Sequence, residues 1–429
     1  MPSVWLLLVM LSSTAVPDED RVDRSRPTDL LQRLDHPDRW RWIPEDRIPE
    51  GKLLQRILVT SFVSPFVFFE GDVGTGGGFT ITDIDFRNKR RSQLANIWAT
   101  YTTEGQERFS ISWKKWLAHN DHPGQGVLQG DRDFLGFTVS HSRTLTSRFF
   151  GLGSETLFSD EGSYSRETNS IGVGIQRSYP EIGGDWVWNA NMFLQSDDLE
   201  SGKVSGALDV ESEHPELFVD GDDYQALWIQ TGIRHDTRDA QHLPYRGHSI
   251  GLDITALPIV DDRDIGAVAS LTGKWIQPVP ALFHNGGDPS QEHSAIDSIA
   301  ASISISTAMG EVPFWALPTL GGDETLRGTI RGRWRDRSAW ITAAEWRPWI
   351  LADGFPISGD IRIERVGLAL FAEAGSVAED LGALAEASIH SSVGVGVRLT
   401  FERQALFRLD FGRSDEGDTN FSIAYGLPF

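Results

Sequence analysis

Apolar and polar residues alternate along most of the chain from about Ile57 to its last residue. A period of two is typical of β-strands, because successive side chains of a strand point to opposite faces. The segments ALFRLDFG and SVGVGVRLTF follow this pattern. The C-terminal segment NFSIAYGLPF is the clearest case, since its large residues all fall on one face: Phe421, Ile423, Tyr425, Leu427 and Phe429. The alternation therefore predicts an all-β chain.

The two faces of the predicted strands differ consistently in composition. One face carries large apolar residues with Trp or Phe near the strand ends, as in Phe109, Ile111 and Trp113, and the other carries Ser, Gly, Asn, Arg and Glu. Alternation alone would also suit a soluble sandwich. The recurrent aromatic residues favour a transmembrane β-barrel with a lipid-facing exterior and a polar lumen. About sixteen strands fit residues 57–429, which predicts a single antiparallel β-barrel.

Residues 1–56 lack this alternation. An apolar run from Val4 to Leu11, followed by small and then charged residues, predicts a signal peptide over residues 1–15. Residues 16–56 are polar and rich in Arg, Asp and Pro, which predicts a periplasmic linker with one short helix near Thr28 to Leu34. No later apolar run reaches the ~18–20 residues that a membrane-spanning helix needs.

Composition narrows the functions that the chain can have. Acidic residues outnumber basic ones 61 to 39 and the formal net charge is -22, so we expect no nucleic-acid partner. The chain has no cysteine, which removes thiol catalysis, disulfides and thiolate zinc sites. Its histidines form no pair at the spacing of a zinc protease, so we predict no metal site and no cofactor.

Two glycine motifs suggest a catalytic or phosphate-binding site. GHSIG, from Gly247 to Gly251, matches the nucleophile elbow of α/β-hydrolases and would make Ser249 a catalytic serine. The residues after it alternate as a strand and do not begin the helix that an elbow needs, so a secreted serine hydrolase is a remote alternative. GTGGG, from Gly74 to Gly78, is not followed by a Lys-Ser or Lys-Thr pair, and we expect it to form a hairpin loop.

A long segment near the C-terminus carries a family signature. EVPFWALPTLGGDETLRGTIRGRWRDRSAWITAAEWRP resembles a region of the bacterial outer-membrane protein-insertase superfamily, the surface-antigen type. This superfamily includes barrel-assembly and autotransporter-assembly insertases and two-partner secretion transporters. Its (L/V)RG(F/Y) loop motif corresponds to Leu326, Arg327 and Gly328, followed here by Thr329. Three further segments resemble its periplasmic turn, its E-x-R strand and its F-x-D-x-G strand: DTRDAQHLPYRG, AAEWRP and VGLALFAEAG.

The resemblance implies a barrel whose sixth extracellular loop is inserted into the lumen. Arg327 would then reach an inward-facing acid, and Glu373 is the first choice, with Glu345 on the neighbouring strand as the second. In a water-filled lumen such a pair contributes only about 1 kcal/mol, so we expect it to position the loop and not to supply bulk stability. Three glycines fit tight turns against the backbone of the barrel wall: Gly321, Gly322 and Gly328.

The first and last strands carry residues that weaken a β-ladder. Pro65 lies in the first strand, whereas Gly426 and Pro428 lie in the last. Proline cannot donate a hydrogen bond to a ladder. We therefore predict a barrel seam that is short of hydrogen bonds and opens sideways into lipid, as the resemblance implies. Phe429 matches the terminal strand signal of the family.

The resemblance also implies the function. It indicates a non-enzymatic protein of the outer membrane of a Gram-negative cell, without catalytic residues, that assists insertion or translocation of polypeptides or of lipid. Its expected partners are outer-membrane lipid and either unfolded outer-membrane protein clients or periplasmic proteins. Residues 16–56 are too short for the polypeptide-transport-associated domains of the insertases, which predicts a barrel-only member. A passive or structural outer-membrane pore with the same fold is the alternative.

Overall fold

The chain forms two compact units. The computed structural model describes residues 39–44, 52, 61–70, 74–84, 93–218, 222–240, 243–260, 264–286, 295–358, 361–401 and 405–429. Unit 1 comprises Met1–Ser147, Ser163–Thr231 and Leu257–Arg263, and unit 2 comprises Arg148–Gly162, Gly232–Ala256 and Asp264–Phe429. The predicted signal peptide and the predicted helix near Thr28 to Leu34 lie outside the described residues.

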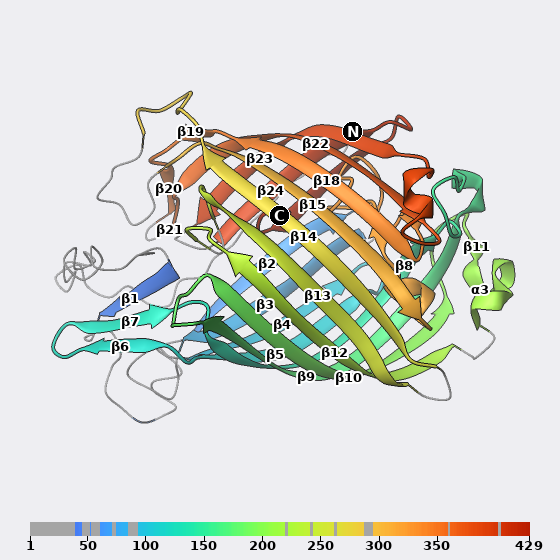
Figure 1. Cartoon of the computed structure of the whole chain (residues 1–429), viewed down its shortest axis with the longest axis horizontal. Coiled ribbons are helices and arrows are strands. Elements are labelled where there is room, and N and C mark those ends of the chain that lie inside the picture. The colour runs from blue at the N-terminus through green and yellow to red at the C-terminus, as the bar shows by residue number, and fades with distance from the viewer. Residues whose placement is uncertain are drawn as a thin grey trace. The chain divides into compact units, whose positions relative to one another are not determined.

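The described residues contain sixteen main strands of one large antiparallel β-sheet (Figure 1). They are β2 (Ser61–Glu70), β3 (Gly74–Ile84), β4 (Gln93–Thr102), β5 (Glu107–Trp116), β8 (Phe134–Phe149), β9 (Gly162–Tyr179), β10 (Trp186–Ser201), β12 (Asp223–Asp236), β13 (Gly247–Val260), β14 (Gly266–Pro278), β15 (Ser298–Gly310), β18 (Ser338–Arg347), β22 (Arg365–Ala378), β23 (His390–Phe401), β24 (Ala405–Ser414) and β25 (Thr419–Tyr425). The short strands β11 (Leu208–Asp209) and β19 (Trp349–Leu351) join the same sheet. The predicted all-β class, strand number and antiparallel pairing are confirmed.

The other described elements are short. They are η4 (Phe158–Asp160), α3 (Val210–Glu213), η5 (Pro215–Phe218), η6 (Phe314–Ala316), β16 (Thr319–Leu320), β17 (Trp334–Arg335), β20 (Phe355–Ser358), β21 (Ile361–Ile363) and η7 (Ala383–Ala385). In the described part of the chain, no helix has the length and apolar character needed to cross a membrane.

The alternation of the sequence gives the sheet one apolar face and one polar face. In the β14–β15 pair, Leu271 lies opposite Ile305, and both side chains are exposed on the apolar face. The next pair along, Ser270 and Ser306, exchanges a hydroxyl hydrogen bond of 2.9 Å on the polar face. Antiparallel register places directly opposite residues on the same face. Each strand therefore contributes to both faces in turn.

One strand forms within the segment that the sequence predicts to be a linker. β1 (Trp40–Pro44) pairs with β7 (Gly126–Gly130), and β7 pairs with β6 (His119–His122) in a small separate sheet (Figure 1). Arg39 Nη1 donates to Asp185 Oδ1 at 2.6 Å and to the carbonyl oxygen of Gly183 at 3.0 Å. Local composition gives no sign of β1, because its pairing partner lies far along the chain.

The structure corrects the prediction for the glycine run. Gly74–Gly78 does not form a hairpin loop but begins strand β3, where it pairs with Phe66–Glu70 of β2. A Cβ on Gly78 would lie 2.8 Å from Cγ2 of Thr100, within strand β4. Glycine is thus needed at Gly78 for close approach of neighbouring strands, which the turn propensity of glycine does not reveal.

The last strand is shorter than its alternation predicts. β25 ends at Tyr425, and Gly426 adopts a φ of 83°, a left-handed conformation that favours glycine. Its backbone N–H donates to the carbonyl oxygen of Leu406 at 2.8 Å. Leu427 and Phe429 therefore do not continue the strand face that holds Phe421, which corrects the predicted pattern for these two residues.

Candidate functional site

The loop between β15 and β18 is a folded element of unit 2. Its strands β16 and β17 pair through Thr319 with Arg335 and Leu320 with Trp334. Gly321 and Gly322 both have a φ of 105°, so the turn after β16 needs residues without a Cβ. The backbone N–H of Gly322 donates to the carbonyl oxygen of Thr329 at 3.2 Å. We call residues 311–337 the clamp loop.

Arg327 of the clamp loop is buried on the polar face of the sheet. Its Nε donates to Glu373 Oε1 at 2.6 Å, and its Nη1 donates to Glu345 Oε2 at 2.8 Å and to Asp410 Oδ2 at 3.2 Å. The backbone N–H of Arg327 donates to Glu373 Oε2 at 2.7 Å. The side chains of Arg327 and Glu345 are 0% exposed. The structure thus places both acids named from the sequence against Arg327, and adds Asp410.

Strand register explains why these acids converge. Glu373 of β22 lies opposite Ala343 of β18 and opposite Ser392 of β23. Ser392 Oγ donates to Glu373 Oε2 at 2.7 Å, which fixes the carboxylate. Glu345 lies two residues beyond Ala343 and therefore on the same face. Polar side chains of the adjacent strands β18, β22 and β23 therefore converge on one place.

Three further arginines complete the charge network. Arg347 Nε donates to Glu345 Oε1 at 2.9 Å. Arg398 bridges Glu345 at 3.1 Å and Asp410 at 2.6 Å. Arg408 Nη1 donates to Asp410 Oδ2 at 2.8 Å, and its Nη2 lies 3.4 Å from Asp323 Oδ2 of the clamp loop. With Arg327 these four arginines contact four acids: Glu345, Glu373, Asp410 and Asp323. The exposed Arg331 of the clamp loop also pairs with Asp323, at 2.6 Å.

A phenylalanine ring lies beneath the guanidinium of Arg327. The Arg327 Cζ lies 3.6 Å from the ring centroid of Phe371, a cation–π geometry. Phe371 is opposite Gly394 in the β22–β23 pair, and a Cβ on Gly394 would lie 2.8 Å from Cε2 of this ring. The ring of Phe371 therefore occupies the space that a side chain at Gly394 would fill.

Gly328 brings the clamp loop into backbone contact with β24. A Cβ on Gly328 would lie 2.6 Å from the backbone nitrogen of Ser414. A Cβ on Gly412 would lie 2.7 Å from the backbone nitrogen of Gly328. Two glycines thus face each other across this contact, and a larger residue at either position would push the loop away from the strand.

Apolar packing surrounds Leu326, the residue before Arg327. Leu326 is buried in a small cluster with Leu320, Trp334, Ala339 and Val377. Trp334 stacks on His390 of β23, with a centroid distance of 3.7 Å. Leu326 of the signature therefore lies among apolar side chains. Thr329, which follows the signature, is also buried, and its hydroxyl makes no hydrogen bond within the described residues.

Sequence reasoning missed Arg333 as an anchor of the clamp loop. Arg333 is 1% exposed, and its Nη1 and Nη2 donate to Oγ1 and the carbonyl oxygen of Thr156 at 2.9 and 2.7 Å. Its guanidinium also lies 4.5 Å from the ring centroid of Phe158. The available signal was the RGRWRDR run after the signature, in which four arginines alternate with other residues.

Electrostatics keep Arg327 charged in this buried position. Burial lowers the pKa of Arg327, but Glu373, Glu345 and Asp410 raise it more strongly, so the pKa lies above its usual range. A buried charge is tolerated only when it is paired. Because Arg327 is fully buried, the sequence-based figure of about 1 kcal/mol for a solvated pair does not apply; removal of one partner of a buried pair costs about 3–5 kcal/mol.

The remaining residues singled out from the sequence lie apart from this network or at its margin. Pro65 lies in β2 opposite Phe79. Phe429 contacts the network, since Arg347 Nη2 lies 3.4 Å from its carbonyl oxygen. Gly426 and Pro428 lie between β25 and Phe429. The predicted seam between first and last strands stays a prediction.

Ser249 does not have the geometry of a catalytic serine. It lies in β13, which begins at Gly247 and runs to Val260 without the turn into a helix that a nucleophile elbow requires. The preceding turn is ordered by Asp236, which accepts from Nε and Nη2 of Arg238 at 2.9 Å each. The structure therefore contradicts the serine-hydrolase alternative, because Ser249 lies within a strand and not at a turn from a strand into a helix.

Comparison with known proteins places this chain in a family. The model of the Omp85 superfamily domain matches residues 91–429. The comparison with curated proteins gives no match. The crystal structure of BamA from Haemophilus ducreyi lacking POTRA domains 1-3 is similar, with a TM-score of 0.54, 12% identity, and coverage of 85% of this chain and 69% of that one. CdiB from Acinetobacter baumannii gives a TM-score of 0.48 and 13% identity over 86% of this chain and 59% of CdiB.

Proposed function

The chain belongs to the Omp85 superfamily, and on that premise we propose that it assists insertion or translocation of polypeptides, or of lipid, as a β-barrel of the outer membrane. The step involves no bond-breaking chemistry. Unfolded outer-membrane proteins or periplasmic proteins are the proposed polypeptide partners. In this proposal the polar face of the sheet lines the lumen, and the apolar face contacts lipid.

The observation that carries the proposal is the burial of Arg327 among three carboxylates. Glu345, Glu373 and Asp410 come from β18, β22 and β24, so one side chain links the clamp loop to three strands. The contact with β25 is weaker in kind: Asn420 Nδ2 donates to the carbonyl oxygen of Arg327 at 3.3 Å. We propose that the clamp loop fixes the arrangement of strands β18, β22, β23 and β24, while the last strand, β25, stays free to move.

The direct test is reconstitution of the full chain in lipid vesicles with a urea-unfolded outer-membrane β-barrel as client. We expect the client to fold into the vesicles faster than in protein-free vesicles, and we expect Arg327→Ala to slow it. Arg331→Ala is the matched control, because Arg331 lies in the same loop and its side chain is 81% exposed, so its ion pair with Asp323 contributes little. Equal client folding with and without the protein contradicts the proposal.

Opening of the seam is a separate part of the proposal. The chain has no cysteine, so introduced cysteine pairs are easily interpreted. We expect a disulfide between the strand that contains Pro65 and the strand that precedes Gly426 to block client insertion, and reduction to restore it. Full insertion by the locked protein would exclude sideways opening.

The passive pore remains the second candidate function. Arg327 holds the clamp loop on the polar face, and this predicts that the loop narrows any pore formed by that face. Single-channel conductance in planar bilayers should be low for the native chain and higher for Arg327→Ala. A pore without insertase function would give that conductance change and no effect on client folding in the vesicle experiment.

A further inference from the structure

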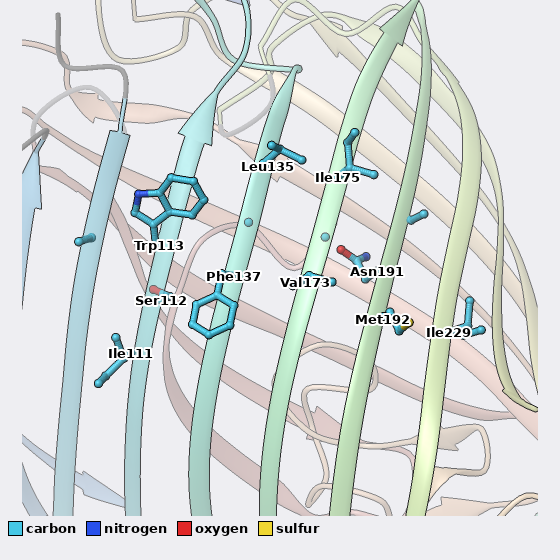
Figure 2. Close-up of a pocket in the computed structure, with 14 residues that line it drawn as sticks. Ile111, Ser112, Trp113, Leu135, Phe137, Val173, Ile175, Asn191, Met192 and Ile229 are labelled. Atoms are coloured by element: carbon cyan, nitrogen blue, oxygen red, sulfur yellow. The ribbon is translucent and has the colours of Figure 1, made fainter. Parts of the chain in front are cut away.

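An apolar groove crosses several strands of unit 1 on the apolar face of the sheet. Its volume is about 840 Å³, within the range of roughly 300–1,000 Å³ typical of ligand sites. Figure 2 shows its lining side chains coming from successive strands, β5, β8, β9, β10 and β12. The larger ones are Trp113, Leu135, Phe137, Ile175, Met192 and Ile229.

Small residues among these large side chains form the depression. Ala95 and Ala190 belong to the lining, and each lies opposite a larger residue in the register: Ala95 opposite Trp113, and Ala190 opposite Ile175. Gly136 and Gly174 also line the groove and expose backbone there. Trp113 Nε1 donates to Gln93 Oε1 at 2.9 Å, which fixes the indole ring at one side. The shape of the groove is therefore built by side-chain size along the strands.

The groove suits a hydrocarbon chain better than a peptide. β5 is paired with β4 on one side and with β8 on the other, so no free strand edge is available to an extended peptide. A peptide laid across the groove in lipid would leave its backbone N–H and C=O groups without partners, which costs several kcal/mol per group. An acyl chain carries no such groups.

A lysine stands at one end of the groove. Lys115 lies opposite Leu135, a lining residue, at the end of β5, and its side chain is exposed. Among the contacts of the described residues, Lys115 makes no ion pair. Arg177, opposite Trp188 at the same end of the sheet, is already bonded through Nε to Asp133 Oδ1 at 3.0 Å. Of these two cations in the described part of the chain, Lys115 is therefore the one whose charge is not already paired.

Exposed aromatic residues surround this end of the sheet. Trp186, Trp188 and Tyr179 are 45%, 44% and 69% exposed near the paired ends of β9 and β10. Amphipathic aromatic rings and basic side chains together are typical of the headgroup level of a membrane. The groove therefore runs from a region suited to headgroups into one suited to acyl chains.

We propose that unit 1 binds an anionic phospholipid on its apolar face, with an acyl chain in the groove and the headgroup phosphate at Lys115. The proposal rests on the membrane placement proposed above. Since lipid tails are as apolar as the groove itself, burial alone gives no preference among lipids. Selectivity for an anionic phospholipid comes from the charge at Lys115 and from the fit of the acyl chain in the groove.

The test is native mass spectrometry of the full chain released from non-ionic detergent micelles with added lipid. Phosphatidylglycerol and phosphatidylcholine with identical acyl chains are compared. We expect tighter retention of phosphatidylglycerol, and we expect Lys115→Gln to lower its affinity about fivefold, the effect of one basic residue near a membrane surface. Lys203→Gln is the matched control, since Lys203 is exposed in a loop beyond β10. Equal retention of both lipids, or equal effects of the two substitutions, overturns the proposal.

A second variant tests the acyl chain separately from the charge. Ala190→Phe places a large side chain in the groove, at a position that is not buried in the protein. We expect it to weaken the binding of both lipids to the same degree. Ala269→Phe on β14 places the same bulk outside the groove and should leave binding unchanged. Inorganic phosphate added in excess should not displace phosphatidylglycerol; displacement would assign the site to free phosphate and overturn the lipid proposal.

Failure of this proposal and failure of the proposed function give different results. The lipid measurement uses purified protein without any client, so a chain that does not insert clients still gives a lipid preference if the groove binds as proposed. Loss of the preference with unchanged client folding removes the lipid site alone.

Discussion

Two regions of the polar face, one in unit 1 and one beneath the clamp loop of unit 2, follow the same alternation but hold different side chains. In unit 1, neutral groups bond one another across the strands, as Asn96 Nδ2 does with Thr80 Oγ1 at 2.6 Å and Ser140 does with Ser170 at 2.8 Å. Under the clamp loop in unit 2, the same face carries buried arginines and carboxylates in a continuous network.

The difference follows from the clamp loop. Buried ions are costly unless each is paired and hydrogen-bonded, so charges on this face need a partner that closes over them. Arg327 is that partner for Glu345, Glu373 and Asp410. Neutral hydroxyl and amide pairs have no such requirement and suit a face that water can reach. The part of the polar face beneath the clamp loop is therefore specialised for holding the loop.

Removal of the Arg327 side chain should have the largest effect on the stability of the clamp loop. Arg327→Ala leaves three buried carboxylates without their shared cation, and we expect the free energy of opening of residues 311–337 to fall by about 3–5 kcal/mol. Hydrogen–deuterium exchange of the full chain in detergent measures this. Arg327→Lys should recover only part of the loss, because an ammonium cannot reproduce the forked contacts. An exchange rate equal to that of Arg331→Ala would mean that burial of Arg327 does not hold the loop.

Loss of the close glycine contact should have an intermediate effect. Gly328→Ala places a Cβ against the backbone of β24, and overpacking of this kind costs about 1–3 kcal/mol. We expect faster exchange in the clamp loop and unchanged exchange in unit 1. Gly273→Ala is the control, since its Cβ would lie 3.5 Å from Ile303 Cγ2, an ordinary contact. If both variants behave like the native chain, the backbone contact is not needed.

Deletion of single hydroxyl groups should distinguish the two regions of the polar face directly. Ser392→Ala removes a hydrogen bond to the buried carboxylate of Glu373, and bonds to charged groups contribute about 1.5–3 kcal/mol. Thr80→Ala in unit 1 removes one acceptor from Asn96 and should cost only about 0.5–1.5 kcal/mol. Thermal unfolding of the two variants in the same detergent gives the comparison. A larger loss for Thr80→Ala would contradict the specialisation of unit 2.

Much of the fold followed from the sequence, because alternation is a local property. The period of two predicted strands, faces and the approximate strand number without any knowledge of contacts. It failed where a contact outweighed the local pattern. Gly74–Gly78 is strand because β2 and β4 pair with it, and Leu427 leaves the last strand because Gly426 turns the backbone.

The sequence predicted only part of the candidate site. Glu345 and Glu373 were named from their inward parity and from the family motifs, and the structure places both against Arg327. Arg398 and Asp410 had the same parity and were not linked to the loop, although they lie within the same network. Alternation along a strand shows which face of the sheet a residue lies on. It does not show which residues of other strands lie at the same level, because that depends on the register of all the strands between them.

By itself, the sequence determined the faces of the strands and the presence of an arginine between a leucine and a glycine in the loop after β15. Only the tertiary structure decided that Arg327 is fully buried and shared by carboxylates from three strands. The physical reason is that alternation acts between neighbouring residues. Burial of a charge, in contrast, depends on groups up to 83 positions away in the chain being brought to hydrogen-bonding distance.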